Sequence, residues 1–334
     1  MTLGYAVLLA LAALALFAVG CGDGAKPSAA AGTKLSVATT VAPLTSIAAQ
    51  IGASRVQVTG IVPEGTNSHT FEPRPSVAEL LSSVDVVFLN GLGLEEPTRK
   101  LAQANLGRDA EIVALGSRSI AKADYAYDFS FPRSAGKPNP HLWTAPRYAR
   151  RYARVIRDLF ARRDPAGKAI YDANFERFAS GVRRLDGAMR TAFATIPRAK
   201  RKLLTYHDAY AYFARDYGWD VIGAIQVSDF EDPTAKEVAA LIDQVKATNV
   251  PAIFGSEVFP SPVLEQIGKE AGVQYVDVLR DDNLPGLPGD PEHSWAGLMR
   301  LDYLTMTKAM GGDAAALEQF KPSDVTADGA EYPQ

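Results

Sequence analysis

The four histidines of this chain are the residues whose type and position best suit metal chemistry. They are His69, His141, His207 and His293, and at least three of them lie in loops or at element boundaries. His69 lies in the proline-punctuated loop GIVPEGTNSHTFEPRP (60–75), directly after an apolar run of β type. Imidazole is the commonest metal ligand among side chains, yet a single loop histidine is usually solvated. His69 therefore indicates a metal site only if other ligands join it.

Each candidate ligand follows a predicted strand or the loop that leaves one. His69 follows 56–62, His141 follows 111–116 after a long loop, His207 follows 202–206 and Asp281 follows 274–279. Ligands collect at the carboxyl ends of strands in α/β sheets, because the loops there can converge without disturbing the core. Two candidates come from each half of the chain. A cleft between two lobes is the simplest geometry that lets all of them meet.

Three imidazole nitrogens and one carboxylate oxygen suit a borderline cation such as Zn²⁺ in a closed, roughly tetrahedral site. Asp282 adjoins Asp281, and the sequence leaves open which carboxylate turns inward. His293, in GDPEHSW, is interpreted as a surface or structural residue, with a secondary site as the alternative. Because each imidazole must be neutral to bind a metal, we expect binding to weaken as pH falls through the histidine range.

A metal-dependent hydrolase is the weaker alternative. A catalytic zinc keeps one coordination position open for water beside a general base. The chain has no His-x-His pair and no His-Glu-x-x-His motif, and four ligands leave no obvious vacancy. We therefore predict that the protein is not an enzyme. Side chains next to the motifs could orient the imidazoles by accepting their second N–H; they are Glu72, Asn139, Asp208 and Glu257.

Short β-branched runs alternate with helical patterns on both sides of residue 200. The predicted strands are 34–39, 56–62, 84–90, 111–116, 202–206, 221–225, 251–255 and 274–279. The predicted helices are 43–51, 75–82, 94–104, 208–217, 234–248, 262–271 and 295–310. This alternation favours an α/β fold with two lobes, 34–168 and 198–334, each built on a parallel four-stranded sheet flanked by helices. A TIM barrel is the rival fold.

A long apolar stripe separates the two halves. Its side chains recur every three or four residues, and they are Tyr171, Phe175, Phe178, Val182, Leu185, Met189, Phe193 and Ile196. Such spacing predicts one helix of about 39 Å, assigned to 169–197. The stripe could pair with a partner chain as a coiled coil. We instead expect one backbone helix that packs across both lobes in a monomer.

The start of the chain resembles an export signal. An unbroken apolar run, LGYAVLLALAALALFAVG (3–20), leads through small residues into Cys21, which resembles a bacterial lipobox. We expect cleavage of the signal peptide 1–20, lipidation of Cys21 and a Gly/Ala/Pro/Ser-rich tether over 21–33. The alternative is a single membrane anchor helix. The mature protein is then expected on the extracytoplasmic face of a bacterial cell membrane.

Composition narrows the possible partners. Cys21 is the only cysteine, so an intramolecular disulfide and a thiolate metal site in the folded body are both excluded. With a net charge of −3, the sequence lacks the excess of basic residues that is typical of nucleic-acid-binding proteins. We predict no nucleic-acid partner.

Several separated motifs resemble the metal-binding extracellular solute-binding proteins (cluster A-I) that serve ABC importers for zinc or manganese. They are IVPEGTNSHTFEPRPSVAELLSSVDVVFLNGLGLE, PNPHLW, LLTYHDAYAYFARDYGW, DPTAKEVAALIDQV, IFGSEVFPSPVLEQIGKEAGV and VLRDDNLPG, in that order. The resemblance covers nearly all of the mature chain. It implies a lipid-anchored receptor that binds a divalent metal between two lobes joined by a backbone helix, and that delivers it to a permease with its ATPase.

The resemblance also implies the ligands. His69 matches the histidine before aromatic-Glu-Pro, His141 that of the proline-histidine motif, and Asp281 the C-terminal aspartate. His207 matches the third ligand, where a glutamate is usually linked to manganese and a histidine more often to zinc. We therefore predict Zn²⁺ as the transported ligand. The histidine-rich acidic loop of some zinc-specific members is missing between 117 and 140, so Mn²⁺ or Fe²⁺ stays the alternative, and an added adhesive role is open.

Overall fold

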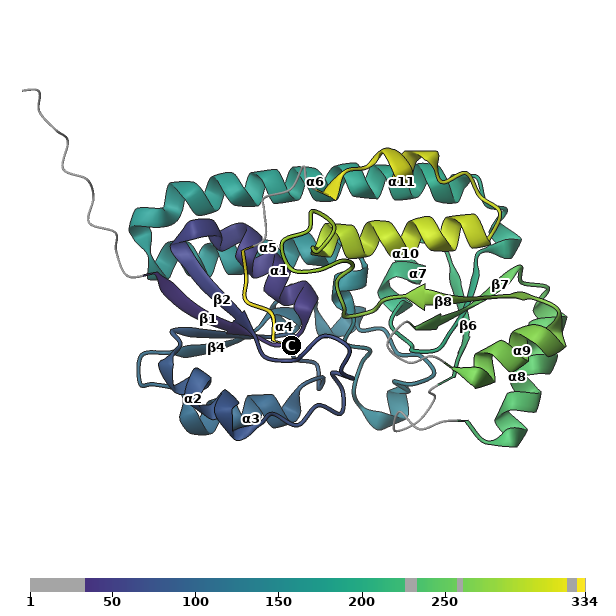
Figure 1. The fold of residues 1–334 in the computed structure, drawn as a ribbon, viewed down its shortest axis with the longest axis horizontal. Helices are drawn as coiled ribbons and strands as arrows, with labels where there is room; N and C mark the ends of the chain where they lie inside the picture. Colours follow the sequence, from purple (N-terminus) through teal and green to yellow (C-terminus); the bar gives the residue numbers. More distant parts are fainter. Residues whose placement is uncertain (1–33, 226–232, 257–260, 323–328, 334) are drawn as a thin grey trace, which may run out of the picture. The chain divides into compact units, whose positions relative to one another are not determined.

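The β-branched runs form two parallel four-stranded sheets in the computed structural model, which describes residues 34–225, 233–256, 261–322 and 329–333 (Figure 1). The first sheet, in the order β2-β1-β3-β4, contains β1 (Leu35–Thr39), β2 (Val56–Gly60), β3 (Val86–Leu89) and β4 (Glu111–Ala114). The second sheet, in the order β6-β5-β7-β8, contains β5 (Lys202–Thr205), β6 (Asp220–Ala224), β7 (Ala252–Ser256) and β8 (Gln274–Leu279). The predicted two-lobe α/β fold is confirmed.

The two sheets repeat one topology. Numbered from its own first strand, each has the order 2-1-3-4, and every pairing between neighbours is parallel. β3 and β7 are buried at every position, as expected of strands covered on both faces. The carboxyl ends of the strands in each sheet therefore lie along one edge, where the loops that leave them can carry ligands.

Helices cover both sheets. Those around the first sheet are α1 (Ala42–Gly52), α2 (Pro75–Ser83), α3 (Glu96–Asn105), α4 (Leu115–Ser119) and α5 (Pro146–Arg163). Those around the second sheet are α7 (Ala211–Tyr217), α8 (Ala235–Thr248), α9 (Pro262–Ala271), α10 (Trp295–Ala309) and α11 (Ala315–Gln319). A capping box begins α8, in which the side chains of Thr234 and Glu237 each accept a hydrogen bond from the other residue's backbone N–H.

Three features differ from the sequence-based expectation. The strand predicted over 111–116 ends at Ala114, because the Gly116 N–H donates to the Asn90 carbonyl and the chain turns into α4. The helix predicted from residue 208 begins at Ala211, because a turn bonds the Ala209 N–H to the His207 carbonyl. The 18-residue helix α5 was not predicted, although it buries Tyr148, Tyr152, Ile156, Leu159 and Phe160 at helical spacing.

The long helix α6 (Lys168–Ala194) joins the two lobes. It packs on α1 and α5 of the first lobe and on α10 and α11 of the second, and runs along one side of both sheets (Figure 1). The predicted apolar stripe forms its buried face from Tyr171 to Phe193, whereas Ile196, the last residue of the stripe, is buried just beyond the end of the helix. One hydrophobic core contains side chains of both sheets and of α6, from Val37 to Phe320. The lobes are therefore packed together through this core.

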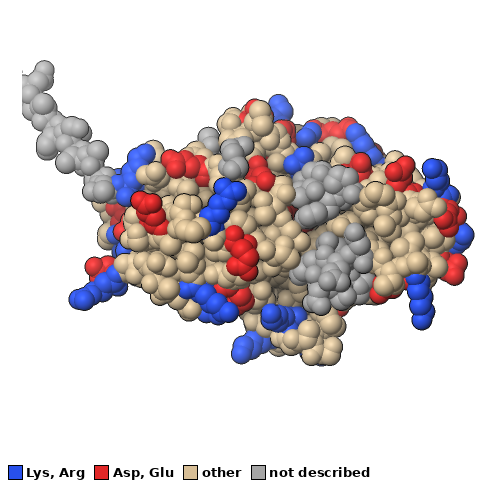
Figure 2. All heavy atoms as spheres, turned by 60° about the horizontal axis from the view of Figure 1, so that its bottom comes forward, with Lys and Arg blue, Asp and Glu red and all other residues tan. Residues whose placement is uncertain are grey.

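The predicted signal peptide, the tether and Cys21 lie outside the described residues. Among the helices of the described part, none is long and apolar enough to cross a membrane. On the face drawn in Figure 2, basic and acidic side chains are interspersed and neither sign forms a continuous patch. That face has mixed charge and does not show the basic stripe typical of nucleic-acid-binding proteins.

Candidate metal centre

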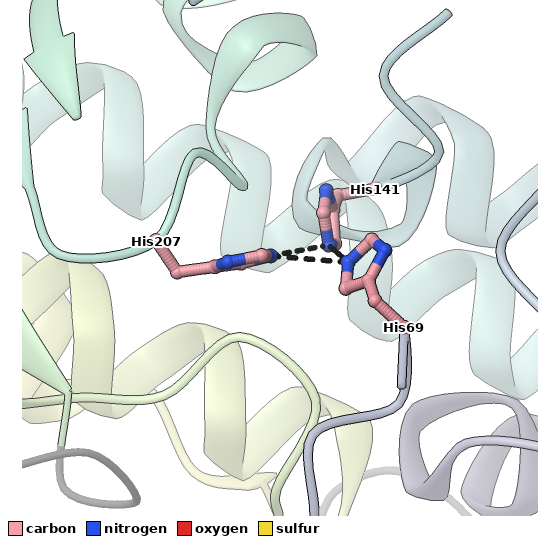
Figure 3. Close-up of side chains that lie close together, drawn as sticks. All are labelled: His69, His141 and His207. Atoms are coloured by element: carbon pink, nitrogen blue, oxygen red, sulfur yellow. Dashed lines mark hydrogen bonds between the residues drawn. The ribbon is translucent and has the colours of Figure 1, made fainter. Parts of the chain in front are cut away.

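Three of the four histidines converge on one point. His69 comes from the loop between β2 and α2, His141 from the loop that leads to α5, and His207 lies two residues beyond the end of β5. Their Nε2 atoms face one another (Figure 3), at 3.1 Å for His69–His141, 3.2 Å for His69–His207 and 3.0 Å for His141–His207. The fold thus brings together three of the residues that the sequence singled out.

The triangle of nitrogens has the size of one face of a tetrahedral site. A zinc ion with Zn–N distances of about 2.0–2.1 Å separates its tetrahedral ligands by about 3.3–3.4 Å. The observed separations, 3.0–3.2 Å, are only slightly shorter. Neutral imidazoles turn lone pairs toward a common point only at the cost of mutual repulsion, and a cation at that point would remove the cost.

The carboxylate of Asp281 lies beside this triangle. Its Oδ2 atom is 3.7 Å from His207 Nε2, and the residue is buried. Asp282 is also buried, but it lines a small hollow with Glu64 and Thr66, and its Oδ1 accepts from Asn283 Nδ2 at 3.1 Å. Of the two adjacent carboxylates, Asp281 is therefore the better placed to complete the set of ligands.

Asn139 sets the tautomer of His141. Its Oδ1 accepts from the His141 backbone N–H and lies 2.9 Å from the ring Nδ1, which must donate to it. The amide cannot be flipped, because its Nδ2 donates to Asp128 Oδ2 and to the Asp208 carbonyl, both at 2.6 Å. With the proton on Nδ1, His141 Nε2 keeps a free lone pair for a metal. Asn139 thus orients an imidazole, as the sequence suggested.

Burial keeps the imidazoles neutral. It lowers the pKa of His69 and His141 well below the ordinary histidine value, and the neighbouring histidines lower these pKa values further. Burial also raises the pKa of the Asp281 carboxyl, to about 6. A bound cation would favour both the neutral imidazoles and the ionised carboxylate, because these are the forms that bind a metal. The four groups are therefore suited to hold a metal ion together.

The other candidate residues have different surroundings. His293 is buried away from the cluster, packs edge-on against Tyr332 and has its Nε2 4.0 Å from Glu64 Oε1. Asp208 is buried, and its Oδ2 accepts from the Ser130 N–H at 3.1 Å rather than from an imidazole. Glu72 takes part in no described contact with the three rings, and Glu257 lies outside the described residues.

Two supporting residues were missed from the sequence. The fully buried Trp143 donates from Nε1 to the Asp281 carbonyl at 2.6 Å, and its ring packs edge-on against His141. Thr144 Oγ1 lies 2.9 Å from the His141 carbonyl and 3.1 Å from the Ala209 carbonyl. Both follow His141 in the motif PNPHLWT, so their nearness in sequence was the available signal.

Comparisons with known proteins agree on one family. A family model described as zinc-uptake complex component A, periplasmic, matches residues 37–309. The manganese-binding lipoprotein MntA of Halalkalibacterium halodurans is 29% identical over 297 residues, covering 89% of this chain and 95% of that protein. The iron-binding protein YfeA of Yersinia pestis is 27% identical, covering 83% of this chain and 87% of that protein.

Solved structures share the fold. The periplasmic zinc-binding protein TroA from Treponema pallidum superposes with a TM-score of 0.75 at 22% identity, over 83% of this chain and 99% of that one. A crystal structure of ZnuA gives a TM-score of 0.72 at 25% identity, over 83% and 99% of the two chains. Both likenesses extend over both lobes and the helix between them.

Proposed function

The chain belongs to the family of the periplasmic zinc-uptake complex component A, and from this premise we propose that it captures Zn²⁺ as cargo and delivers it to an ABC permease. Relatives are substrate-binding components of metal ABC transporters, so the chain is a metal-binding transport component and not an enzyme. The proposed ligands are His69, His141, His207 and Asp281.

The observation that carries this proposal is the convergence of three Nε2 atoms within 3.2 Å of one another, beside a buried carboxylate. Three imidazoles and one carboxylate match the ligand preference and the coordination number of zinc. Four protein ligands also close the site to water, as suits capture rather than hydrolysis. Mn²⁺ or Fe²⁺ is the second candidate, because similar proteins are named for manganese and for iron.

Metal content and thermal shift distinguish the candidates. We expect the purified chain to hold one zinc ion, and zinc to raise its melting temperature more than manganese does. The stabilisation should be about 2.7 kcal/mol when free zinc is at 100 times its Kd. A larger shift with manganese would keep the transport role and overturn the choice of zinc. Failure of zinc, manganese and iron alike to bind would overturn the proposed function.

We further propose that Cys21 carries the lipid anchor that holds the protein at the extracytoplasmic face of the membrane. Support comes from the small residues before Cys21 and from relatives that are named lipoproteins. In a bacterial host fed a labelled fatty acid, the wild-type protein should take up label and Cys21→Ser should not. Equal labelling of the two proteins, or none of the wild type, would contradict the anchor.

A further inference from the structure

The proposed ligands are held in two different ways, and we propose that Glu64 and Asn283 are positioning residues that latch the His69 loop onto the Asp281 loop and set how long the metal stays bound. The latch consists of Glu64, Gly65, Asn283 and Leu284. This inference rests on the proposed function, because it assigns the step by which the same site keeps and releases its metal.

His141 and His207 are fixed to each other across the two lobes. Asn139 Nδ2 donates to the carbonyl of Asp208, the residue after His207. Thr144 Oγ1 lies within hydrogen-bond distance of both the His141 and the Ala209 carbonyls, which share its one proton, and Tyr212 OH donates to the Asn139 carbonyl at 2.9 Å. All these side chains are fully buried, so the bonds are shielded from competition with water.

Asp281 is fixed to the same framework through its backbone. Trp143 Nε1 donates to the Asp281 carbonyl at 2.6 Å, and Trp143 is itself anchored by Trp295 Nε1, which donates to its carbonyl at 3.0 Å. One residue earlier, the Arg280 N–H donates to Asp302 Oδ1 at 3.0 Å, and Asp302 is fully buried on α10. Three of the four proposed ligands therefore belong to one cross-linked framework.

His69 is held differently. It is half-buried, whereas His141, His207 and Asp281 are buried. Its loop leaves the first sheet after Val62, and hydrogen bonds inside the loop tie the His69 N–H to Asn67 Oδ1 and the Thr66 N–H to the Pro63 carbonyl. These bonds give the loop a local shape. The His69 ring also packs against Phe131, with their ring centroids 5.6 Å apart.

The latch adds two hydrogen bonds between the His69 loop and the Asp281 loop. The Gly65 N–H donates to Asn283 Oδ1 at 2.6 Å, and the Leu284 N–H donates to Glu64 Oε1 at 2.9 Å. These two reciprocal bonds join residues that are 218 and 220 positions apart in the chain. Gly65 has φ of 76°, so a glycine is needed for the loop to turn its N–H toward Asn283.

The geometry makes His69 the last ligand to join the metal and the first to leave. While the latch is closed, His69 Nε2 stays within 3.2 Å of the other two Nε2 atoms. When it opens, His69 can swing out on its loop and leave three ligands, a weaker set. Loss of the latch should therefore speed metal release more than it slows capture, because capture begins on the fixed framework.

The test is the rate of zinc release into excess chelator, measured by stopped flow on the full chain. Asn283→Ala and Glu64→Ala should each speed release about three- to ten-fold, the equivalent of one lost hydrogen bond. Glu64→Gln keeps the acceptor for Leu284 and should release zinc at the wild-type rate. Gln57→Ala is the matched control, because it removes an exposed 3.2 Å bond from Gln57 Nε2 to Glu331 Oε1 that is not part of the latch.

Hydrogen exchange on the wild-type protein gives a second, variant-free readout. Zinc should slow exchange in residues 64–70 far more than in residues 139–145. Unchanged release rates in both alanine variants, or equal protection of the two segments, would overturn the latch while leaving metal transport intact. A wild-type protein that binds neither zinc nor manganese would instead overturn the proposed function, and the latch with it.

Discussion

Replacing His207 by alanine is expected to weaken zinc binding by more than about 100-fold, a larger loss than removal of a ligand's hydrogen-bond partner causes. The variant loses one of the four proposed donors, whose Nε2 lies 3.0 Å from that of His141 and 3.2 Å from that of His69. The fold should survive, because His207 lies at the end of β5 rather than in the apolar core. Its removal also relieves the crowding of three lone pairs.

Isothermal titration with zinc measures the loss of affinity in His207→Ala, and thermal unfolding of the metal-free protein measures any loss of stability. Asn174→Ala is the matched control, because Asn174 is also a buried polar residue, and its Nδ2 donates to the Ile51 carbonyl at 2.9 Å on α1. This control should lower the melting temperature by the cost of an unsatisfied carbonyl and leave zinc affinity unchanged. An His207→Ala protein with wild-type affinity would remove His207 from the site.

Replacing Asp281 by asparagine is expected to have opposite effects on metal binding and on stability. The variant lacks the only proposed anionic ligand, so zinc affinity should fall by orders of magnitude. Burial raises the pKa of Asp281 to about 6, above its ordinary value, so the folded protein favours the protonated carboxyl. That stabilisation is complete below the ordinary pKa and is lost as pH rises through about 6. At pH 7.5 the metal-free variant should therefore be more stable than wild type, by about 1–3 kcal/mol.

The same carboxyl sets the pH dependence of binding. Below about pH 6 protons compete for Asp281, and wild-type affinity should fall up to about ten-fold per pH unit. The lowered pKa values of His69 and His141 keep these rings neutral, so the decline should begin below the ordinary histidine range. Asp281→Asn should lack this step, and at pH 4 the two metal-free proteins should be equally stable. A decline with the same midpoint in both proteins would assign it to the histidines instead.

Much of the fold could be predicted from the sequence, because its signals are local. Strands such as β8 were predicted at their observed bounds, and the stripe that begins at Tyr171 marked α6 correctly. The helix α5 was missed because its many arginines hide an apolar face that repeats at helical spacing. The aliphatic part of an arginine side chain can lie along apolar surface while its charged end reaches water. The high charge of α5 therefore does not show how much of the helix is buried.

The candidate site was only partly predictable. Strand ends and rare histidines pointed to His69, His141 and His207, and the structure brings these three together. The sequence pattern does not show whether Asp281 or Asp282 turns toward the histidines. That depends on contacts with residues more than 60 positions away, such as His207 and Glu64. The bonds of Trp143 and of the latch cross between segments that are far apart in the chain, and no local pattern encodes such contacts.

Anomalous diffraction from a crystal grown with zinc tests the central claim most directly. We expect one strong peak at the zinc absorption edge, about 2.0–2.1 Å from Nε2 of each of the three clustered histidines and bound to an Asp281 oxygen. A zinc ion that is bound elsewhere, or that leaves any of the three imidazoles outside its coordination shell, would contradict the account.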